Sequence, residues 1–284
     1  MTEKKIVSET LYDGYAQSFE VSELLFEFRT EHQHLEIVET PFMGRVMLLD
    51  GIVQTTEKDE FIYHEMMVHV PLFSHPNPRR VLIIGGGDGG ILREVLRHKT
   101  VEHVTQVEID QSVIDMCKTY FPKHSNGAFD DPRAHIVIGD GKDFVANCKE
   151  TFDVIISDST DPIGPGEVLF TSDFYADEKT CLNPGGIMVA QNGVPFMQGE
   201  EVTNTHRRLS KLYQDASFYV APVPTYIGGF MTLAWATDDT SLRQQTPAEL
   251  APRIQVAGFA TRYYNADVHA AAFALPNYVR NLLV

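Results

Sequence analysis

RVLIIGGGDGG, residues 80–90, is the stretch that best predicts the fold. A run of apolar residues, 81–84, has the length of one strand and is followed by five glycines around a single acid, Asp88. A continuous apolar run bounded by glycine is typical of a strand buried on both faces. Glycines at this point let the backbone approach a ligand closely at the start of a helix. The pattern G-x-G-x-x-G, weak evidence by itself, is satisfied by Gly85, Gly87 and Gly90.

Four further strands of the same kind follow, separated by segments of helix length. They are HVTQVEI (103–109), AHIVIGD (134–140), FDVIISD (152–158) and GIMVAQN (186–192). This alternation predicts a doubly wound α/β fold, a mostly parallel sheet covered by helices on both faces. An antiparallel pair at one edge is predicted from SFYVAPVP (217–224) and FMTLAWAT (230–237). Such an edge pair is typical of the methyltransferase-like variant of the Rossmann-type sheet, and the C-terminal residues are predicted to be helical.

The residues before this sheet predict a small antiparallel β domain, 1–57, followed by a catalytic domain, 58–284. Asp50-Gly51 predicts a tight hairpin turn. A helix is predicted over 58–76, with acids favoured at its start and Pro71 interrupting its last part. The strands predicted in the first domain are 34–40, 45–51, 52–57 and one or two more within 18–30.

Composition limits the classes of function. The formal net charge of −16 argues against nucleic-acid binding, which needs basic stripes, and permits a cationic ligand. No apolar run is long enough to cross a membrane, and the opening MTEKKIVSET lacks the apolar core of a signal peptide. Three widely spaced cysteines indicate neither a disulfide framework nor a zinc site. A cytoplasmic location is therefore expected.

Acids follow four successive strands of the predicted sheet: Asp88, Glu108, Asp140 and Asp158. Ligands of such sheets bind at the carboxyl ends of the strands, so these acids are expected at one rim. An acid at the end of the second strand commonly binds ribose hydroxyls. The pyrophosphate of a dinucleotide would be repelled by four acids, whereas a sulfonium nucleoside carries a positive charge and no phosphate. A nucleoside of the S-adenosylmethionine type is favoured over NAD.

Other residues have ordinary interpretations. His64 and His69 resemble a zinc motif, but they are five residues apart and face different ways on a helix, so metal binding is not expected. Tyr63 and His64 on an amphipathic helix would more often be packing residues. Ser157 lacks a nucleophile elbow and a histidine partner, which argues against a hydrolase.

Long motifs carry a family resemblance. DGIVQTTEKDEFIYHEMMVHVPL, VLIIGGGDGGILREVLRH, VEIDQSVI and DVIISDSTDPIGPGEVLF closely resemble the spermidine synthases, the polyamine aminopropyltransferases, and QNGVPF, PTYIGGFMTLAWAT and RYYNADVHAAAFALP extend the match. The resemblance covers nearly the whole chain and is strongest to the bacterial, putrescine-using branch. One departure is Ile6-Val7-Ser8, where family members often have a tryptophan.

The resemblance implies an enzyme that transfers the aminopropyl group of decarboxylated S-adenosylmethionine to putrescine, giving spermidine and 5′-methylthioadenosine. It implies no permanently bound cofactor, no metal, and a homodimer or homotetramer. The implied donor-binding residues are Gln33, Asp88, Glu108, Asp140, Gly141 and Pro165. The implied base is Asp158, and the implied diamine-binding residues are Tyr63, His64, Asp158, Asp161 and Tyr226, with Gln54 close by.

The chemistry assigns different tasks to the acids. Asp158 would accept the proton of the attacking amine, and Asp161 would pair with the far ammonium. Asp88 would attract the amine of the decarboxylated donor and repel the carboxylate of intact S-adenosylmethionine. Two other hypotheses are a methyltransferase, which methylthioadenosine among the products would exclude, and a polyamine-binding protein without turnover. The acceptor could also be cadaverine, agmatine or spermidine.

Overall fold

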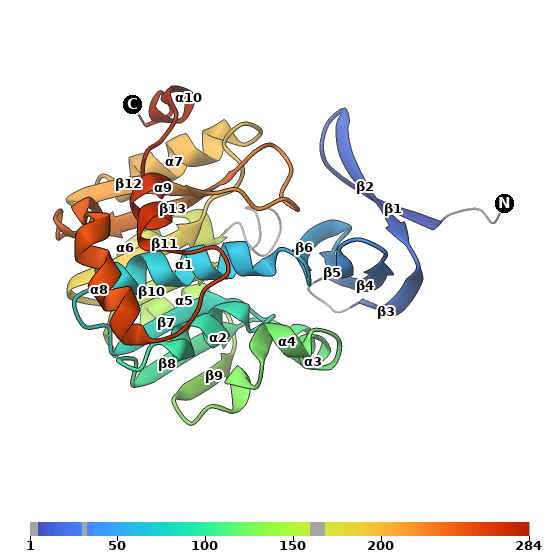
Figure 1. Ribbon diagram of the computed structural model, residues 1–284, viewed down its shortest axis with the longest axis horizontal. Coiled ribbons are helices and arrows are strands. Elements are labelled where there is room, and N and C mark those ends of the chain that lie inside the picture. Colours follow the sequence, from blue (N-terminus) through green and yellow to red (C-terminus); the bar gives the residue numbers. More distant parts are fainter. Residues whose placement is uncertain (1–4, 30–32, 160–167, 284) are drawn as a thin grey trace.

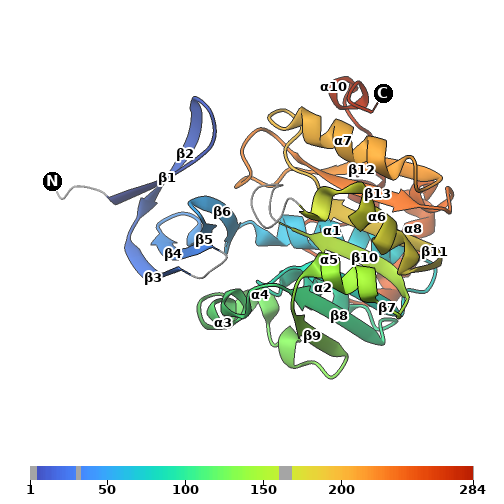
Figure 2. The same cartoon turned by 180° about the vertical axis from the view of Figure 1, so that it is seen from behind.

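A computed structural model describes residues 5–29, 33–159 and 168–283. The N-terminal strands lie to one side of a larger α/β part, and helix α1 leads from one into the other (Figure 1). The same arrangement is seen from behind in Figure 2. The fold class expected from the sequence is confirmed.

The N-terminal strands form a two-stranded hairpin, β1–β2, and a four-stranded antiparallel sheet of order β3-β4-β5-β6. Asp50 and Gly51 join β5 to β6 with φ angles of 51° and 79°, which confirms the predicted tight turn. The strands are β1 (Lys5–Tyr12), β2 (Tyr15–Val21), β3 (Glu23–Arg29), β4 (His34–Thr40), β5 (Gly44–Leu49) and β6 (Ile52–Thr56).

The four-stranded sheet is covered on both faces. One face places Leu35 and Ile37 of β4 against Val113 and Phe121 of the α/β part. The opposite face gathers an apolar cluster of Val21, Val38, Val46, Leu48 and Val53. Because side chains alternate along a strand, adjacent residues of β4 and β5 serve the two clusters. The N-terminal sheet is thus packed against the α/β part and forms one wall of the space between them.

The large sheet has seven strands in the order β12-β13-β11-β10-β7-β8-β9. The strands from β11 to β9 are parallel to one another, and β13 and β12 add an antiparallel pair at one edge. This is the topology predicted from the sequence. The strands are β7 (Arg80–Gly85), β8 (His103–Glu108), β9 (Ala134–Ile138), β10 (Phe152–Asp158), β11 (Leu182–Gln191), β12 (Asp215–Ala221) and β13 (Met231–Thr237).

Helices cover both faces of this sheet. Helices α1, α8 and α9 lie on the face toward the viewer in Figure 1, and α5, α6 and α7 lie on the opposite face, seen in Figure 2. The helices are α1 (Glu60–Ser74), α2 (Gly90–Arg97), α3 (Gln111–Tyr120), α4 (Pro122–Ser125), α5 (Gly141–Asn147), α6 (Ser172–Thr180), α7 (Gly199–Leu209), α8 (Pro247–Ala257), α9 (Ala266–Ala272) and α10 (Asn277–Arg280).

Burial on two sides explains the continuous apolar runs of the central strands. In β10, Val154 and Ile156 enter the cluster on one face and Ile155 enters the cluster on the other, and all three are fully buried. Strand β7 divides its apolar residues in the same way. Each side chain has a hydrophobic layer to pack against, so there is no polar alternation for the sequence to show.

Two expectations are corrected by the structure. Helix α1 continues through Pro71 to Ser74 instead of being interrupted there. Proline lacks only its own N–H, and the backbone N–H of His75 still donates to the Pro71 carbonyl at 2.9 Å. Strand β11 begins at Leu182, earlier than predicted, because a register shift with Gly185 at a φ of 78° accommodates a sequence that is typical of a turn.

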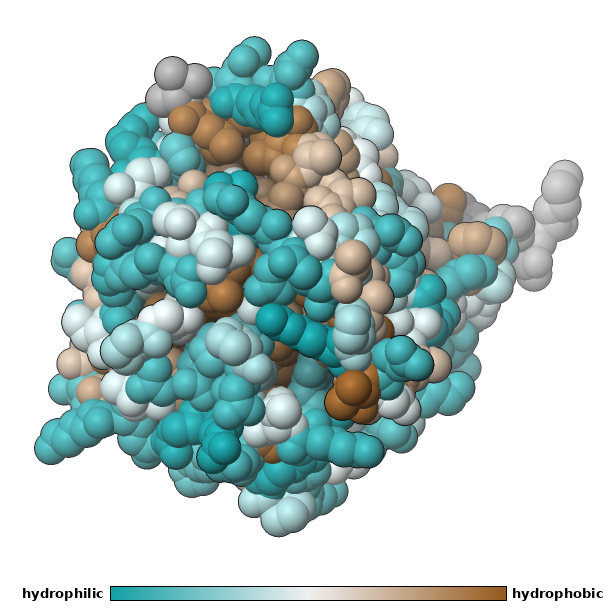
Figure 3. Space-filling model, turned by 60° about the vertical axis from the view of Figure 1, so that its left-hand side comes forward, coloured by the Kyte–Doolittle hydropathy of each residue, from teal (hydrophilic) through white to brown (hydrophobic). Residues whose placement is uncertain are grey.

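The surface seen in Figure 3 is largely hydrophilic, with a larger apolar area toward the C-terminal end at the top. Within the described residues, no helix combines the length and the apolar character needed to cross a membrane.

Candidate active site

A cavity of about 290 Å³ lies where the carboxyl ends of β7, β8 and β10 face the N-terminal sheet. All ten predicted site residues that fall within the described part of the chain line it. They are Gln33, Gln54, Tyr63, His64, Asp88, Glu108, Asp140, Gly141, Asp158 and Tyr226. Asp161 and Pro165, also predicted, lie outside the described residues. Residues far apart in the sequence are thus brought to one concave site.

The glycine turn after β7 leaves room for the backbone of β10 and for a side chain of α1. A Cβ atom on Gly85, whose φ is 82°, would lie 2.0 Å from the backbone oxygen of Asp158. A Cβ on Gly90 would lie 2.2 Å from Cε1 of His64. Both distances are far below van der Waals contact. The glycines are therefore required by the close approach of β10 and α1 to this turn.

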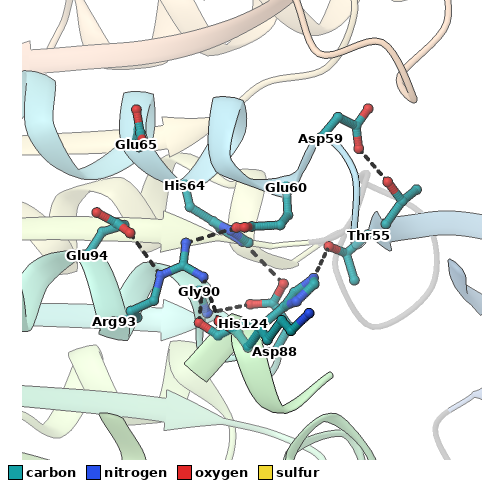
Figure 4. Close-up of polar contacts among 12 residues, drawn as sticks. Thr55, Asp59, Glu60, His64, Glu65, Asp88, Gly90, Arg93, Glu94 and His124 are labelled. Carbon is teal, nitrogen blue, oxygen red and sulfur yellow. Dashed lines mark hydrogen bonds and ion pairs between the residues drawn. The ribbon is translucent and has the colours of Figure 1, made fainter. Parts of the chain in front are cut away.

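Asp88, inside the turn, is buried and held by two partners. Its Oδ1 accepts the backbone N–H of Gly90 at 2.8 Å, and its Oδ2 lies 3.1 Å from Nε2 of His64 (Figure 4). Burial alone would raise the pKa of Asp88, but the charge and hydrogen bond of His64 lower it below its usual range. Asp88 is therefore an ionised carboxylate at neutral pH.

His64 is paired on its other side as well. Its Nδ1 lies 2.6 Å from Oε2 of Glu60, which also accepts from Nη2 of Arg93 at 2.9 Å (Figure 4). Burial lowers the pKa of His64, but the carboxylates of Asp88 and Glu60 outweigh this effect and raise it to about 10. His64 is therefore an imidazolium cation at neutral pH.

Asp158 ends β10 next to the glycine turn, and its residue position pairs with Gly85 across the two parallel strands. Its Oδ1 accepts the hydroxyl of Tyr63 at 2.5 Å. Loss of solvent raises the pKa of Asp158 to about 6; the Tyr63 hydrogen bond and His64 oppose the rise and Asp88 adds to it. This carboxylate is mostly ionised at neutral pH and is a stronger base than an ordinary aspartate.

Tyr63 and Tyr226 form an aromatic wall beside Asp158. Tyr63 is buried, and its ring meets the ring of Tyr226 edge to face with centroids 5.9 Å apart. The Tyr226 hydroxyl donates to the backbone oxygen of Gln54 at 2.5 Å. Tyr226 therefore connects the loop before β13 to β6 of the N-terminal sheet, and this contact fixes one wall of the cavity.

Glu108 stands at the end of β8, where a ribose-binding acid is expected. Its Oε1 accepts the backbone N–H of Asp110 at 3.0 Å. Burial raises the pKa of Glu108 to about 7, although that backbone hydrogen bond opposes the change. Gln33 Nε2 donates to Oδ2 of Asp110 at 3.3 Å, so the N-terminal sheet reaches the same end of the cavity.

Asp140 and Gly141 begin α5 after β9. The Oδ1 of Asp140 accepts the backbone N–H groups of Lys142 at 2.7 Å and Asp143 at 3.3 Å, the geometry of a helix N-cap. A Cβ atom on Gly141 would lie 2.5 Å from Cγ2 of Ile84. Asp140 thus has a structural task in addition to lining the cavity, and Gly141 is needed for packing.

These contacts give the four acids different partners, and Asp88 differs from Glu108 and Asp158 in its protonation behaviour. Asp88 is paired with a cation, Glu108 has a pKa near neutrality, and Asp140 caps a helix. Of these four acids, Asp158 is the one that combines a raised pKa with a hydrogen bond to a tyrosine. The sequence pattern predicted different tasks for some of these acids but not the partners that distinguish them.

Three charged residues near the site were not predicted from the sequence. Glu60 and Arg93 form the outer part of the His64 network, and the spacing of Glu60 and His64, four residues apart on one helix, was an available signal. Glu9 of β1 lines the cavity and accepts the backbone N–H of Val53 at 2.9 Å. No pattern in the sequence marks Glu9, because both of its neighbours in β1 are exposed and polar.

His69 takes part in a separate network. Its Nε2 lies 3.0 Å from Oε2 of Glu94 and its Nδ1 lies 2.9 Å from Nε2 of His98, away from the cavity. His64 and His69 therefore do not share a ligand site. Among the residues that the structure describes, no three histidine, cysteine, aspartate or glutamate side chains are grouped to hold a metal ion.

Family models match most of the chain. Residues 60–246 match the spermine/spermidine synthase domain, and residues 6–57 match the spermidine synthase tetramerisation domain. Among similar curated proteins, polyamine aminopropyltransferase 1 of Pseudomonas aeruginosa is 62% identical over 271 residues, 95% of each chain. The polyamine aminopropyltransferase of Escherichia coli O1:K1 is 57% identical over 283 residues, 100% of this chain and 98% of the relative.

Solved structures agree with this match. A crystal structure of spermidine synthase in complex with the transition-state analogue AdoDATO superposes with a TM-score of 0.93 at 38% identity, covering 100% of this chain and 97% of the other. The spermidine synthase of Thermotoga maritima superposes with a TM-score of 0.92 at the same identity, covering 100% and 96%. The chain therefore belongs to the spermine/spermidine synthase family of polyamine aminopropyltransferases.

Proposed function

We propose that the protein transfers the aminopropyl group of decarboxylated S-adenosylmethionine to putrescine, producing spermidine and 5′-methylthioadenosine. The observation that carries this proposal is the pair of carboxylates at the ends of β7 and β10. Asp88 is fixed in its ionised form by His64, whereas Asp158 has a pKa of about 6 and accepts a hydrogen bond from Tyr63. One carboxylate suits the binding of a cation and the other suits the acceptance of a proton.

The nucleoside of the donor would occupy the end of the cavity near β8. Glu108 would accept hydrogen bonds from the ribose hydroxyls, and these would stabilise its ionised form. Gln33, Asp140 and Gly141 line the same cavity, and Pro165, outside the described residues, is proposed from the sequence alone. The similar spermidine synthase that was solved with AdoDATO supports a donor site in this fold.

The diamine would enter between Asp158 and the aromatic wall of Tyr63 and Tyr226, with His64 and Gln54 at its border. An amine with a pKa of about 10.4 is protonated at neutral pH and has no free electron pair. The adjacent sulfonium disfavours a second positive charge and lowers this pKa. Asp161, outside the described residues, is proposed from the sequence to pair with the distal ammonium.

The chemical step forms one bond and breaks one. The amine nitrogen attacks the methylene carbon next to sulfur, and the carbon–sulfur electron pair returns to sulfur, which converts the sulfonium into the thioether of methylthioadenosine. The attacking nitrogen gives up a proton, and Asp158 accepts it. Much of the remaining acceleration would come from holding the nitrogen, carbon and sulfur in line.

Asp88 would select the decarboxylated donor. An intact donor would bring a carboxylate toward Asp88 and Asp158, and two like charges ~5 Å apart at an effective dielectric constant of ~20 repel by about 3 kcal/mol. His64 neutralises part of the Asp88 charge, so the discrimination in binding is expected to be smaller than this value. It would still favour the donor that carries an amine and no carboxylate.

The match of residues 6–57 to a tetramerisation domain supports an oligomer, and we propose a homodimer or homotetramer. The division into an N-terminal domain, 1–57, and a catalytic domain, 58–284, is part of the same proposal.

The test is an assay of the purified protein with putrescine and decarboxylated S-adenosylmethionine. Mass spectrometry should detect spermidine and methylthioadenosine in equal amounts. Intact S-adenosylmethionine should give neither an aminopropylated nor a methylated diamine. Formation of methylputrescine and S-adenosylhomocysteine, or binding without turnover, would refute the proposal. Cadaverine, agmatine and spermidine, assayed in parallel, would define the acceptor range.

A further inference from the structure

A chain of alternating charges runs from Arg93, its most exposed member, to the cavity. Arg93, Glu60, His64 and Asp88 follow one another at 2.9, 2.6 and 3.1 Å (Figure 4). Their side chains are between 3% and 15% exposed. Each of these four charged groups contacts at least one group of opposite charge, and such pairing is what allows ions to be buried.

The geometry fixes the protonation of the imidazole. Both ring nitrogens of His64 lie within hydrogen-bond distance of carboxylate oxygens, Nδ1 of Glu60 and Nε2 of Asp88. An ionised carboxylate only accepts hydrogen bonds, so both nitrogens must carry a proton. A neutral ring would place a nitrogen electron pair against one of the two carboxylates. The raised pKa of His64, despite its burial, agrees with this conclusion.

Arg93 makes the outer end of the chain rigid. Its Nη2 donates to Glu60, its Nε donates to Oε1 of Glu94 at 2.8 Å, and its Nη1 donates to the backbone oxygens of Lys123 at 3.0 Å and His124 at 2.8 Å. The planar guanidinium thus connects α1, α2 and the end of α4. Glu60 cannot turn away from His64 without losing its bond to an anchored partner.

We propose that Glu60 and Arg93 are positioning residues of the aminopropyltransferase site. Arg93 holds Glu60, Glu60 keeps both nitrogens of His64 protonated, and His64 holds the Asp88 carboxylate at a fixed place in the cavity. Neither Glu60 nor Arg93 is among the cavity-lining residues, so both act through His64. The inference rests on the proposed function, because the consequence of a fixed Asp88 is tight binding of the cationic donor.

Several charged groups surround His64 and must be considered in any titration. Asp88 faces it from the β7–α2 turn, Glu60 lies on its own helix, and the ring of His124 on α4 lies 6.0 Å away. Arg93 acts on it from α2 through Glu60, and the charge of Asp158 interacts with it from β10. The two carboxylates in direct contact dominate, since the others are farther away.

The direct test uses nitrogen NMR of the imidazole in the whole, ligand-free protein. The signal of His64 is assigned by its absence in His64→Gln. Both ring nitrogens of the wild-type protein should stay protonated from about pH 6 to about pH 8. In Glu60→Gln one ring proton should be lost within that range. A variant whose ring keeps both protons throughout would overturn the proposal. This readout needs no turnover, so it stays interpretable even if the proposed reaction fails.

Kinetics give the second readout. Glu60→Gln keeps the shape of the side chain and removes its charge, and the KM for decarboxylated S-adenosylmethionine should rise about tenfold, the equivalent of one lost charge-assisted contact, while kcat changes less. The matched control is Glu102→Gln, which removes the same charge from an exposed ion pair with Arg79 and should leave both constants unchanged. An unchanged donor KM in Glu60→Gln would contradict the proposal.

A double-mutant cycle separates positioning from a general structural role. If Glu60 acts through His64, Glu60→Gln should add little to the donor KM of His64→Gln. Full additivity of the two effects would overturn the proposal. Arg93→Lys, which keeps the charge and loses the planar fork, provides a variant that does not depend on the folding of Glu60→Gln. It should raise the donor KM several-fold, and a wild-type KM would remove Arg93 from this role.

Discussion

Two carboxylates that follow adjacent strands of this protein have pKa values shifted in opposite directions. Asp88, after β7, contacts an imidazolium and a backbone N–H, and its pKa is lowered. Asp158, at the end of β10, receives a hydrogen bond from Tyr63, and its pKa is raised to about 6. The difference shows that the surroundings, and not the residue type, decide which acid is a fixed charge and which can exchange a proton.

The strongest challenge to this comparison is Asp158→Asn. The variant cannot accept a proton, so kcat should fall by about 10²- to 10⁴-fold while the affinity for the donor stays near the wild-type value. Stopped assays of spermidine formation and calorimetric titration of the donor measure the two quantities. The control is Asp173→Asn at the exposed start of α6. A kcat equal to that of the wild-type protein would remove Asp158 from its role.

The contact between the two strand ends can be tested with paired glycine substitutions. Gly85 and Gly127 both have a φ of 82°, but a Cβ on Gly127 would meet open space. Gly127→Ala should therefore cost only the backbone term of about 1 kcal/mol of unfolding free energy, and Gly85→Ala about 1–3 kcal/mol more because of the clash with Asp158. Urea unfolding measures both. Equal losses would show that the strands do not need to approach so closely.

Asp158→Asn should also stabilise the fold. The pKa of Asp158 is raised from 3.8 to about 6, so ionising it in the folded protein costs up to about 3 kcal/mol, a cost that is complete above pH 6 and absent below the unfolded value near 4. Asparagine avoids this cost. The free energy of unfolding of the variant should exceed that of the wild-type protein at pH 7, with a difference that disappears as the pH falls to about 4. A variant less stable at pH 7 would contradict the raised pKa.

The smallest expected effect concerns Tyr63→Phe. The Tyr63 hydroxyl lowers the pKa of Asp158, so its removal should raise that pKa further. In the wild-type protein, kcat/KM should fall about tenfold per unit as the pH drops below about 6, and this limb should move to higher pH in the variant, with a loss of a few-fold at pH 7. Tyr15→Phe at an exposed position serves as the control. If the acidic limb of the pH profile stays in place in Tyr63→Phe, Tyr63 does not control the pKa of Asp158.

The sequence predicted the architecture well, for identifiable reasons. Strands β7 and β10 have apolar runs because both faces are covered, and Asp50-Gly51 has the residues that a tight turn requires. Strand β1 was not predicted as a separate element, since polar residues interrupt its apolar ones and only one of its residues is buried. The predicted interruption of the helix at Pro71 was wrong, because burial along α1 offsets the loss of a single backbone donor.

The residues of the candidate site were easier to predict from the sequence than their pKa values and hydrogen-bond partners. Strand ends and the family resemblance predicted ten of the residues that line the cavity. Asp161 and Pro165, also predicted, lie outside the described residues. Different tasks were expected for Asp88 and Asp158, but the surroundings that shift their pKa values in opposite directions were not predictable. They depend on which groups α1 brings to each carboxylate, and a helix delivers adjacent side chains such as Tyr63 and His64 to different partners only once it is packed.

The most direct test is to measure the pKa of both carboxyl groups by carbon NMR in the ligand-free protein, with each signal assigned by the corresponding asparagine variant. Asp158 should titrate near pH 6, and Asp88 should remain ionised at every pH at which the protein stays folded. Two carboxyl groups that titrate together near the ordinary value of about 4, or in the reverse order, would contradict the division of roles.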